Sequence, residues 1–379
     1  MFSRIKILCV IGTRPEAIKM APVIKELLLH SSVFDLHVCS TGQHLDMLNQ
    51  VLNVFNINTN SELKVMQHDQ SLTSVTSLIL QRISPLLNSF KPDWMLVQGD
   101  TVTVAASSLA AFYNHVKVGH IEAGLRSNDR LNPYPEEINR RLTSVIANRH
   151  FATSRISKEN LIRENISSRD IIISGNTVVD SLLFAKNMDP SSYALKLTDN
   201  LDKRILFVTI HRRVNLGEPL TNILNALKLL AILYRNSLHI IFPVHLNPNV
   251  YEPVKRTLSG ESNISLVEPL DYFTLIHVIS KSYILLTDSG GLQEEAPTLG
   301  KPVFILRKTT ERPEAILAGV AKLVGTESSS IVKEVSEILD NYKLYLEMSR
   351  PLQVYGDGLA AKRIVASLSG SHFEEFNSI

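Results

Sequence analysis

Short apolar runs rich in β-branched residues alternate with longer amphipathic stretches along the whole chain. This alternation is typical of βαβ units built around a parallel sheet. It occurs in two successive series. In the first series the predicted strands are residues 6–11, 34–40, 94–98, 116–120 and 171–174, with helices such as 72–89 and 136–148. In the second series the predicted strands are residues 204–209, 238–242, 283–287 and 302–306. The pattern therefore predicts an α/β protein with two doubly wound domains.

The segment 187–204 is rich in Asp, Ser and Asn and lacks clear periodicity, so we interpret it as the boundary region. We expect an N-terminal domain over residues 1–175 and a C-terminal domain over residues 176–359. Residues 360–368 have a helical pattern but follow no strand, and a helix at about 360–379 is expected to pack back on the N-terminal domain. Ligands of open parallel sheets bind beyond the carboxyl ends of the strands, so the site is expected in a cleft between the domains.

The composition fits a globular chain with a proper core, because 44% of the residues are apolar and 20% are charged. The net charge of +2 gives no broad attraction to nucleic acid or to a membrane surface. The apolar run at residues 5–11 is short and indicates a strand rather than a signal peptide, and no run of about eighteen apolar residues suggests a membrane span. We therefore expect a cytoplasmic protein. Cys9 and Cys39 have no metal-binding or redox spacing and are expected to be buried and reduced.

The first anion-site candidate follows the first predicted strand, where Gly12 to Glu16 (GTRPE) lead into a helix. Free backbone N–H groups at the helix start, together with the Arg14 guanidinium, would attract an anion. The alternative is purely structural, because Thr13 and Glu16 have the spacing of a capping box. Lys19 lies on the same helical face as Glu16, where it is either a solvated lysine or a ligand of the site.

The second candidate follows the strand predicted at residues 283–287. Ser289, Gly290 and Gly291 precede a helical stretch, and glycines at such a turn allow close approach of a diphosphate to the backbone. Glu295 is placed to accept hydrogen bonds from ribose hydroxyls, although adjacent glutamates early in a helix would also stabilise its dipole. The spacing is not GxGxxG, which argues against a nicotinamide cofactor.

Polar residues at strand exits and helix starts are the candidates for acid–base chemistry. Asp100 follows a strand, where it is either functional or the N-cap of the next helix. Glu122 lies in a strand's exit loop with no evident capping role, whereas Glu136 begins a helix, where acids are favoured anyway. His211 and His245 each follow a strand of the second series. No histidine spacing suggests a metal site, so no metal is expected.

Seven blocks of sequence, in order along nearly the whole chain, resemble the non-hydrolysing UDP-N-acetylglucosamine 2-epimerase family. The blocks are Gly12-Thr13-Arg14-Pro15-Glu16-Ala17, Gln98-Gly99-Asp100-Thr101, His120-Ile121-Glu122-Ala123-Gly124-Leu125-Arg126, Pro135-Glu136-Glu137, His245-Leu246-Asn247-Pro248-Asn249, Ser289-Gly290-Gly291-Leu292-Gln293-Glu294-Glu295-Ala296-Pro297 and Thr310-Glu311-Arg312-Pro313-Glu314-Ala315. A series of this length is far more specific than any single motif.

The resemblance implies a glycosyltransferase-B architecture of two Rossmann-like domains, no cofactor, and a homodimer. It assigns catalytic positions to Asp100, Glu122, Glu136 and His211. It assigns UDP or substrate binding to Arg14, Lys19, Ser289, Gly290, Gly291 and Glu295. In some bacterial relatives a second UDP-N-acetylglucosamine activates the enzyme, and the positions similar to that site are Gln43, His44, Arg212 and His245. Two departures from the family pattern are Gln98, where many members have His, and Ile210, where a small residue is frequent.

The resemblance also implies a reaction, namely interconversion of UDP-N-acetylglucosamine and UDP-N-acetylmannosamine for surface polysaccharide precursors. The hydrogen on carbon 2 has no neighbouring carbonyl, so a carboxylate cannot remove it until UDP begins to leave carbon 1. Elimination gives a 2-acetamidoglucal, and re-addition of UDP after protonation on the other face completes the inversion. The alternatives are epimerisation of a modified UDP-N-acetylhexosamine, a glycosyltransferase of the same architecture, a hydrolysing epimerase and a non-catalytic UDP-sugar sensor.

Overall fold

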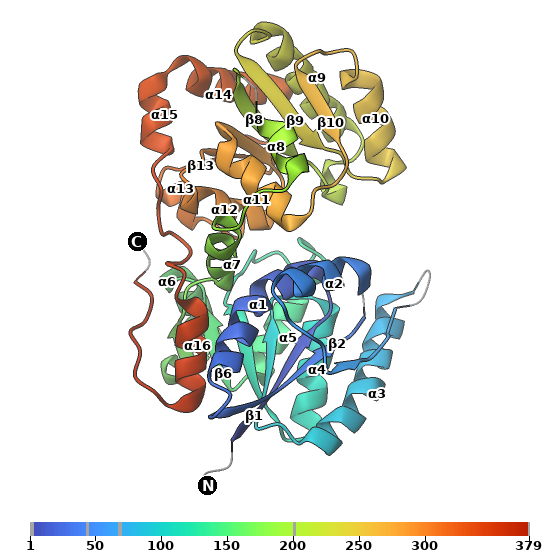
Figure 1. Ribbon diagram of the computed structural model, residues 1–379, viewed down its shortest axis with the longest axis vertical. Coiled ribbons are helices and arrows are strands. Elements are labelled where there is room, and N and C mark those ends of the chain that lie inside the picture. The colour runs from blue at the N-terminus through green and yellow to red at the C-terminus, as the bar shows by residue number, and fades with distance from the viewer. Residues whose placement is uncertain (1–3, 43–44, 67–69, 200–201, 378–379) are drawn as a thin grey trace. The chain divides into compact units, whose positions relative to one another are not determined.

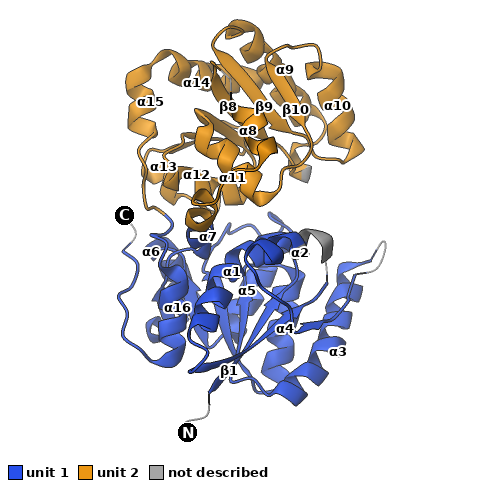
Figure 2. Ribbon diagram, in the orientation of Figure 1, with its two compact units in different colours: residues 1–181, 355–378 blue, residues 182–354, 379 orange. Residues whose placement is uncertain are grey.

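The computed structural model describes residues 4–42, 45–66, 70–199 and 202–377. The chain forms two compact units, of which unit 1 contains residues 1–181 and 355–378 and unit 2 contains residues 182–354 and 379 (Figure 2). The divisions expected from the sequence alone are 175/176 and 359/360, a few residues away from these.

Unit 1 is built on a parallel sheet (Figure 1). Within the described residues its strand order is β3-β2-β1-β4-β5-β6-β7. Its strands are β1 (Ile5–Ile11), β2 (Phe34–Ser40), β3 (Ser61–Glu62), β4 (Trp94–Gln98), β5 (Lys117–Ala123), β6 (Arg149–Ala152) and β7 (Ile171–Ile173). Its helices are α1 (Arg14–Leu29), α2 (Leu45–Val54), α3 (Leu72–Phe90), α4 (Val102–Tyr113), α5 (Glu136–Ile146), α6 (Arg155–Arg163), the 3₁₀ turn Ser168–Asp170 and α16 (Ala360–Ser369). Helix α7 (Thr177–Lys186) crosses the division between the units.

The sheet of unit 1 is buried on both faces, as is usual for parallel sheets. Leu8 and Val10 of β1 pack in a cluster with apolar residues of α3 and α4. Ile7 and Cys9 alternate with them, point to the other face and are equally buried. On that face α1 packs against the sheet and against α2 and α16. The burial of Cys9 raises the pKa of its thiol, which agrees with an inert, reduced cysteine.

Unit 2 repeats this arrangement with a parallel sheet in the order β10-β9-β8-β11-β12-β13 within the described residues. Its strands are β8 (Arg204–Thr209), β9 (Leu238–Pro243), β10 (Ile264–Val267), β11 (Ile284–Thr287), β12 (Val303–Ile305) and β13 (Ala321–Leu323). Its helices are α8 (Ser192–Thr198), the 3₁₀ turn Arg213–Asn215, α9 (Glu218–Leu233), α10 (Pro248–Leu258), α11 (Tyr272–Lys281), α12 (Gly290–Thr298), α13 (Glu314–Leu317), α14 (Ser328–Asp340) and α15 (Tyr342–Met348). The prediction of two doubly wound parallel α/β sheets is therefore confirmed.

The structure differs from the sequence analysis at residues 187–204, which were expected to form an aperiodic boundary. This segment contains α8, whose N-cap Ser191 accepts a hydrogen bond from the Ala194 N–H at 3.1 Å. Ala194 is fully buried, and α8 packs against α11 inside unit 2. A short polar helix with one buried face gives too few apolar positions to show a period in the sequence.

In the part of the chain that the structure describes, no helix combines the length and the apolar character that crossing a bilayer requires.

Candidate active site

Glu122 was expected in the loop after its strand, but the structure places it inside β5, one residue before the strand ends. The pairing of β5 with β6 shifts register here, between Ile121 and Ala123. The φ angle of Glu122 is 64°, a left-handed conformation that is rare for a residue other than glycine. Only 8% of Glu122 is exposed. Strained backbone of this kind persists where the surroundings hold it and clusters at functional sites. The bulge therefore sets the direction of one particular carboxylate.

Three buried donors from separate elements hold the Glu122 carboxylate. The Lys19 ammonium of α1 pairs with Oε1, and the Gln98 amide at the end of β4 donates to Oε2. Asn176, between β7 and α7, donates its Nδ2 to Oε1 at 3.2 Å. An ionised carboxylate only accepts hydrogen bonds, so three converging donors favour the charged form. Lys19 is thus a buried partner of the site rather than a solvated lysine.

Asp100 follows β4 and is paired with the guanidinium of Arg140 from α5. Its side chain is 28% exposed, so one part of it remains open to solvent. The alternative reading of Asp100 as an N-cap is wrong, because the N-cap of α4 is Thr101, whose hydroxyl accepts from the Val104 N–H at 3.3 Å. Asp100 is therefore available for a role other than helix capping.

Glu136 is the first residue of α5 and is partly buried. Arg140, the partner of Asp100, lies four residues after Glu136 in α5. Residues four apart share one face of a helix, so Glu136 lies on the face of α5 that pairs with Asp100. The neighbouring Glu137 is different. It is fully buried and accepts from Ser127 N at 3.0 Å and from Arg140 Nη1 at 3.2 Å, which gives it a structural role.

The turn Gly12–Glu16 before α1 forms a variant of the predicted capping box. Glu16 reaches back and accepts from Gly12 N at 2.7 Å, while the Thr13 hydroxyl donates to Glu16 at 3.0 Å instead of capping the helix. Burial raises the pKa of Glu16 to about 7. A Cβ on Gly12 would lie 2.4 Å from the Thr103 hydroxyl, so this tight turn requires glycine. Arg14 is partly buried at the first position of α1.

His120 was not singled out by the sequence analysis, although it lies beside the site. It is fully buried on β5, and its Nε2 lies 2.7 Å from the carbonyl oxygen of Gly99. Burial lowers the pKa of His120 to about 4, so the ring is neutral and donates from Nε2–H. His120 thereby fixes the turn between β4 and Asp100. Like Asn176, it is recognisable only once the order of the strands is known.

In unit 2, Ser289 is the N-cap of α12, and Gly290 and Gly291 are its first two residues. The Ser289 hydroxyl makes no capping bond, and a Cβ on Gly290 would lie 2.9 Å from Arg312 Nη1. The start of α12 therefore has no space for a side chain at position 290, and the Ser289 side chain does not cap its backbone N–H groups. These are the features expected of a helix N-terminus that binds an anion.

Glu295 is the sixth residue of α12 and is buried beside Tyr272 of α11. Burial and the Glu295 carboxylate raise the pKa of Tyr272 well above its usual value. The helix-dipole reading of Glu294 and Glu295 is wrong, because no acidic residue lies in the first turn of α12.

His211 follows β8, with 45% of its side chain exposed. Its Nδ1 lies 3.0 Å from Oδ1 of Asp288, and its backbone N–H also points to this buried carboxylate at 3.1 Å. An Nδ1–H that donates to Asp288 leaves Nε2 as the outward-facing nitrogen.

The four positions proposed for a second UDP-sugar are only partly described. The Arg212 guanidinium lies 3.6 Å from Glu311. Its burial and, to a smaller extent, the charge of the neighbouring Arg307 lower the pKa of Arg212. His245 is exposed, and its Nδ1 accepts from Asn247 N at 3.1 Å. Gln43 and His44 lie outside the described residues.

A cluster around Glu311 is a further feature of unit 2. Arg307 lies 2.9 Å from Glu311 Oε2, and the Arg312 guanidinium pairs with both Glu311 and Glu294. The surrounding guanidinium charges hold the pKa of Glu311 well below its usual range, although burial alone would raise it. The cluster orders the Thr310 to Ala315 block next to the start of α12.

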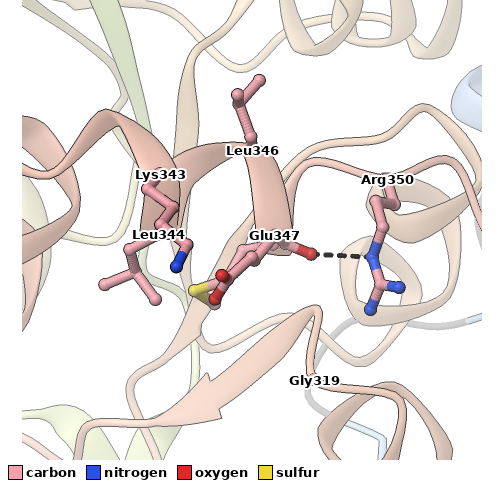
Figure 3. A pocket seen from close by; sticks show the side chains of 7 residues that line it. Gly319, Lys343, Leu344, Leu346, Glu347 and Arg350 are labelled. Atoms are coloured by element: carbon pink, nitrogen blue, oxygen red, sulfur yellow. Dashed lines mark hydrogen bonds between the residues drawn. The ribbon is translucent and has the colours of Figure 1, made fainter.

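Among the residues that the structure describes, no group of His, Cys, Asp and Glu is arranged to hold a metal ion. The hollow in Figure 3 lies beside α15 in unit 2 and contains none of the candidate residues. It is lined by Gly319, Lys343, Leu344, Leu346, Glu347, Met348 and Arg350.

Comparison with known proteins supports the resemblance seen in the sequence. A family model described as UDP-N-acetylglucosamine 2-epimerase matches residues 27–369. The chain is 46% identical to the UDP-N-acetylglucosamine 2-epimerase of Escherichia coli K12, over 97% of this chain and 99% of the relative.

Solved structures agree with the sequence relatives. A UDP-GlcNAc 2-epimerase from Neisseria meningitidis, bound to UDP-GlcNAc, is 45% identical with a TM-score of 0.92 and covers 97% of this chain and 100% of its own. A putative UDP-N-acetylglucosamine 2-epimerase from Listeria monocytogenes is 40% identical with a TM-score of 0.95 and covers 99% and 100%. The chain therefore belongs to the UDP-N-acetylglucosamine 2-epimerase family.

Proposed function

We propose that this protein interconverts UDP-N-acetylglucosamine and UDP-N-acetylmannosamine by eliminating UDP and adding it back without hydrolysis. The observation that carries the proposal is the Glu122 carboxylate, which is buried at a strand end and accepts hydrogen bonds from Lys19 and two amides. Membership of the family supports the same activity.

The chemistry requires a stabilised cation before any proton can be removed. As the bond from carbon 1 to UDP lengthens, carbon 1 gains oxocarbenium character, and the hydrogen on carbon 2 becomes acidic. Loss of that proton gives a 2-acetamidoglucal. A proton delivered to the opposite face of carbon 2, followed by return of UDP to carbon 1, gives the epimer with all atoms conserved.

The acids of unit 1 are assigned to the sugar. Glu122 and Asp100 stabilise the cation and move the proton, with Glu136 as the third carboxyl group. A general acid or base of this kind contributes about a hundredfold to ten-thousandfold. Arg14 supplies positive charge at a helix start, where anions bind favourably.

The residues of unit 2 are assigned to the nucleotide. The open backbone at Ser289, Gly290 and Gly291 binds the diphosphate, and Glu295 accepts from the ribose hydroxyls. Asp288 holds the His211 ring with its outward nitrogen towards the leaving phosphate, and this nitrogen donates to the phosphate when the ring is protonated. Preorganised donors of this kind are usually the largest contribution to catalysis.

The cellular setting is part of the same proposal. A nucleotide-sugar product fits a cytoplasmic enzyme that supplies precursors for surface polysaccharide. A second UDP-N-acetylglucosamine is proposed to act as activator through Gln43, His44, Arg212 and His245. No redox cofactor is needed on this route, because neither the elimination nor the re-addition transfers a hydride.

A homodimer is proposed on the basis of an apolar surface in unit 1. Phe112 and Tyr113 end α4, Leu142 and Val145 lie in the last two turns of α5, and these two helices pack side by side. Each of the four side chains is exposed, Val145 by 81%. Apolar groups gathered in this way mark contact surfaces between proteins. Light scattering should give the mass of two chains, and V145E should reduce it to one.

The test of the function is a nuclear magnetic resonance time course with a panel of UDP-sugars and no acceptor. Epimerised UDP-N-acetylhexosamine is expected, with UDP-N-acetylglucosamine converted fastest. Preference for a modified sugar would favour that alternative, and Gln98 beside Glu122 would be the residue to examine first. Steady release of free UDP would indicate hydrolysis, and no reaction without an acceptor would contradict the proposal.

A further inference from the structure

The chain passes from one compact unit to the other twice, and the segments next to both crossings meet in unit 1. Asn176 precedes the first crossing, at 181/182, and Tyr355 follows the second, at 354/355. The backbone N–H of Asn176 donates to the carbonyl oxygen of Tyr355 at 2.7 Å.

Glycines make this meeting close. Gly175 has a φ angle of 81°, and a Cβ built on it would lie 3.3 Å from Gly356 Cα. A Cβ on Gly356 would in turn lie 3.1 Å from Val179 Cβ and 3.2 Å from the Asn176 carbonyl oxygen. The two segments are therefore packed so tightly that neither glycine position has room for a side chain without movement.

The side chain of Asn176 points from this contact to the catalytic carboxylate. It is 1% exposed, its Oδ1 accepts from Val178 N at 3.0 Å, and its Nδ2 donates to Glu122 Oε1 at 3.2 Å. The bond from Val178 N–H requires an oxygen at that end of the amide, so the orientation of the amide is determined by its partners. The donor is left facing Glu122.

The other two donors to Glu122 differ in origin. Lys19 comes from α1 and Gln98 from β4, both inside the body of unit 1. Asn176 instead belongs to the segment that continues directly into α7 and the first crossing. Any change in how residues 175–176 pack on 355–356 would therefore move one donor of the carboxylate and leave the other two.

We propose that Asn176 is a positioning residue, which fixes the Glu122 carboxylate from the place where the two crossing segments meet. The proposal rests on the proposed function, because it takes Glu122 as the group that acts on the sugar. In this role Asn176 touches neither sugar nor nucleotide. It makes the geometry of Glu122 depend on the contact between Asn176, Tyr355 and Gly356.

The first test is Asn176→Asp. This variant keeps the side-chain shape and the acceptor for Val178 N–H, but it replaces the donor to Glu122 by an oxygen. Misplacing a catalytic group by about 1 Å costs on the order of a hundredfold in rate. We expect kcat for epimerisation to fall about a hundredfold, KM to change by less than about threefold, and UDP affinity to stay near that of the unchanged protein. The melting temperature should fall, because two buried carboxyl oxygens then face each other.

The matched control is Thr177→Val. Thr177 is the next residue, is equally buried, and its hydroxyl has no hydrogen-bond partner among the described residues. This variant should keep kcat within about twofold. Equal loss in both variants would show that the segment tolerates no change, and it would overturn the specific role of Asn176.

The second test addresses the contact between the crossings. Gly356→Ala pushes a methyl group against Val179, and it should lower kcat through displacement of Asn176. Because both changes act through the same hydrogen bond, the double variant with Asn176→Asp should lose less than the product of the two single losses. Multiplicative losses would overturn the link between the crossings and Glu122.

The outcomes separate this inference from the proposed function. If the unchanged protein does not epimerise UDP-sugars, the proposed function fails. If it does, and Asn176→Asp keeps its kcat or loses UDP affinity instead, the function stands and the positioning role of Asn176 is overturned.

Discussion

Glu122 lies near the end of β5 in unit 1, and Asp288 directly follows β11 in unit 2. Both carboxylates are buried, yet they are held in different ways. Glu122 is held by side chains from three elements, one of them the cation Lys19. Asp288 accepts from the backbone N–H groups of His211 and Arg212 and from the Asn215 amide. It also contacts the His211 ring.

We infer from this difference that Asp288 has a structural role and that Glu122 is the carboxylate proposed to act on the sugar. Backbone donors fix Asp288 to the loop after β8, so its charge serves to orient His211. Burial alone would raise the pKa of Asp288, but the hydrogen bond and charge of His211 outweigh burial and lower it. Glu122 is instead held by the side chains of Lys19, Gln98 and Asn176, which preorganise its carboxylate for a transient cation.

The largest effect is expected for Glu122→Gln, which removes the charge and keeps the shape. Turnover should fall by about a hundredfold to ten-thousandfold. UDP binding, measured by calorimetry, should remain nearly intact because the nucleotide is assigned to unit 2. A variant with normal turnover would remove Glu122 from the mechanism and end the contrast with Asp288.

A smaller effect, mainly on stability, is expected for Asp288→Asn. The new amide nitrogen would face N–H donors of the loop after β8, and an unpaired buried donor costs about 1–3 kcal/mol. Urea unfolding should show this loss, and turnover should fall with it because His211 loses its orienting partner. Asp340→Asn at the exposed end of α14 is the control. Unchanged stability of the Asp288 variant would show that the carboxylate is not a structural clamp.

The smallest effect on turnover is expected for Glu16→Gln, which changes the pH dependence of stability instead. Glu16 has a folded pKa of about 7, raised by burial from 4.5, so the folded state prefers its protonated form. Its contribution to stability is fully present below pH 4.5 and is lost as the pH rises through 7, with a slope of on the order of 1 kcal/mol per pH unit. Glutamine cannot titrate, so unfolding curves of the variant should show a weaker dependence over this window. Parallel curves for both proteins would contradict the assignment.

Much of the fold was predictable, because buried parallel strands appear as apolar runs. All nine predicted strands are present, with ends within a few residues. The strands that were missed are short or carry polar residues, as with the arginine and histidine that open β6 (Arg149–Ala152). Their place in the sheet comes from neighbouring strands rather than from their own pattern.

The site was predictable where one residue carries the signal and not where several must meet. Glu122 was recognisable as a strand-exit carboxylate without a capping role. Its bond to Lys19 spans 103 positions and depends on β1, β4 and β5 being neighbours, which no local pattern records. Asp288 was missed for the same reason, since its partners lie 73 to 77 positions away.

In the proposed reaction the hydrogen on carbon 2 leaves and is replaced while UDP is detached, which turnover in D₂O followed by nuclear magnetic resonance of the sugar tests. We expect one deuterium at carbon 2 in the product, accumulating at the rate of epimerisation. Inverted product that keeps its original hydrogen in full would contradict the elimination of UDP and its re-addition.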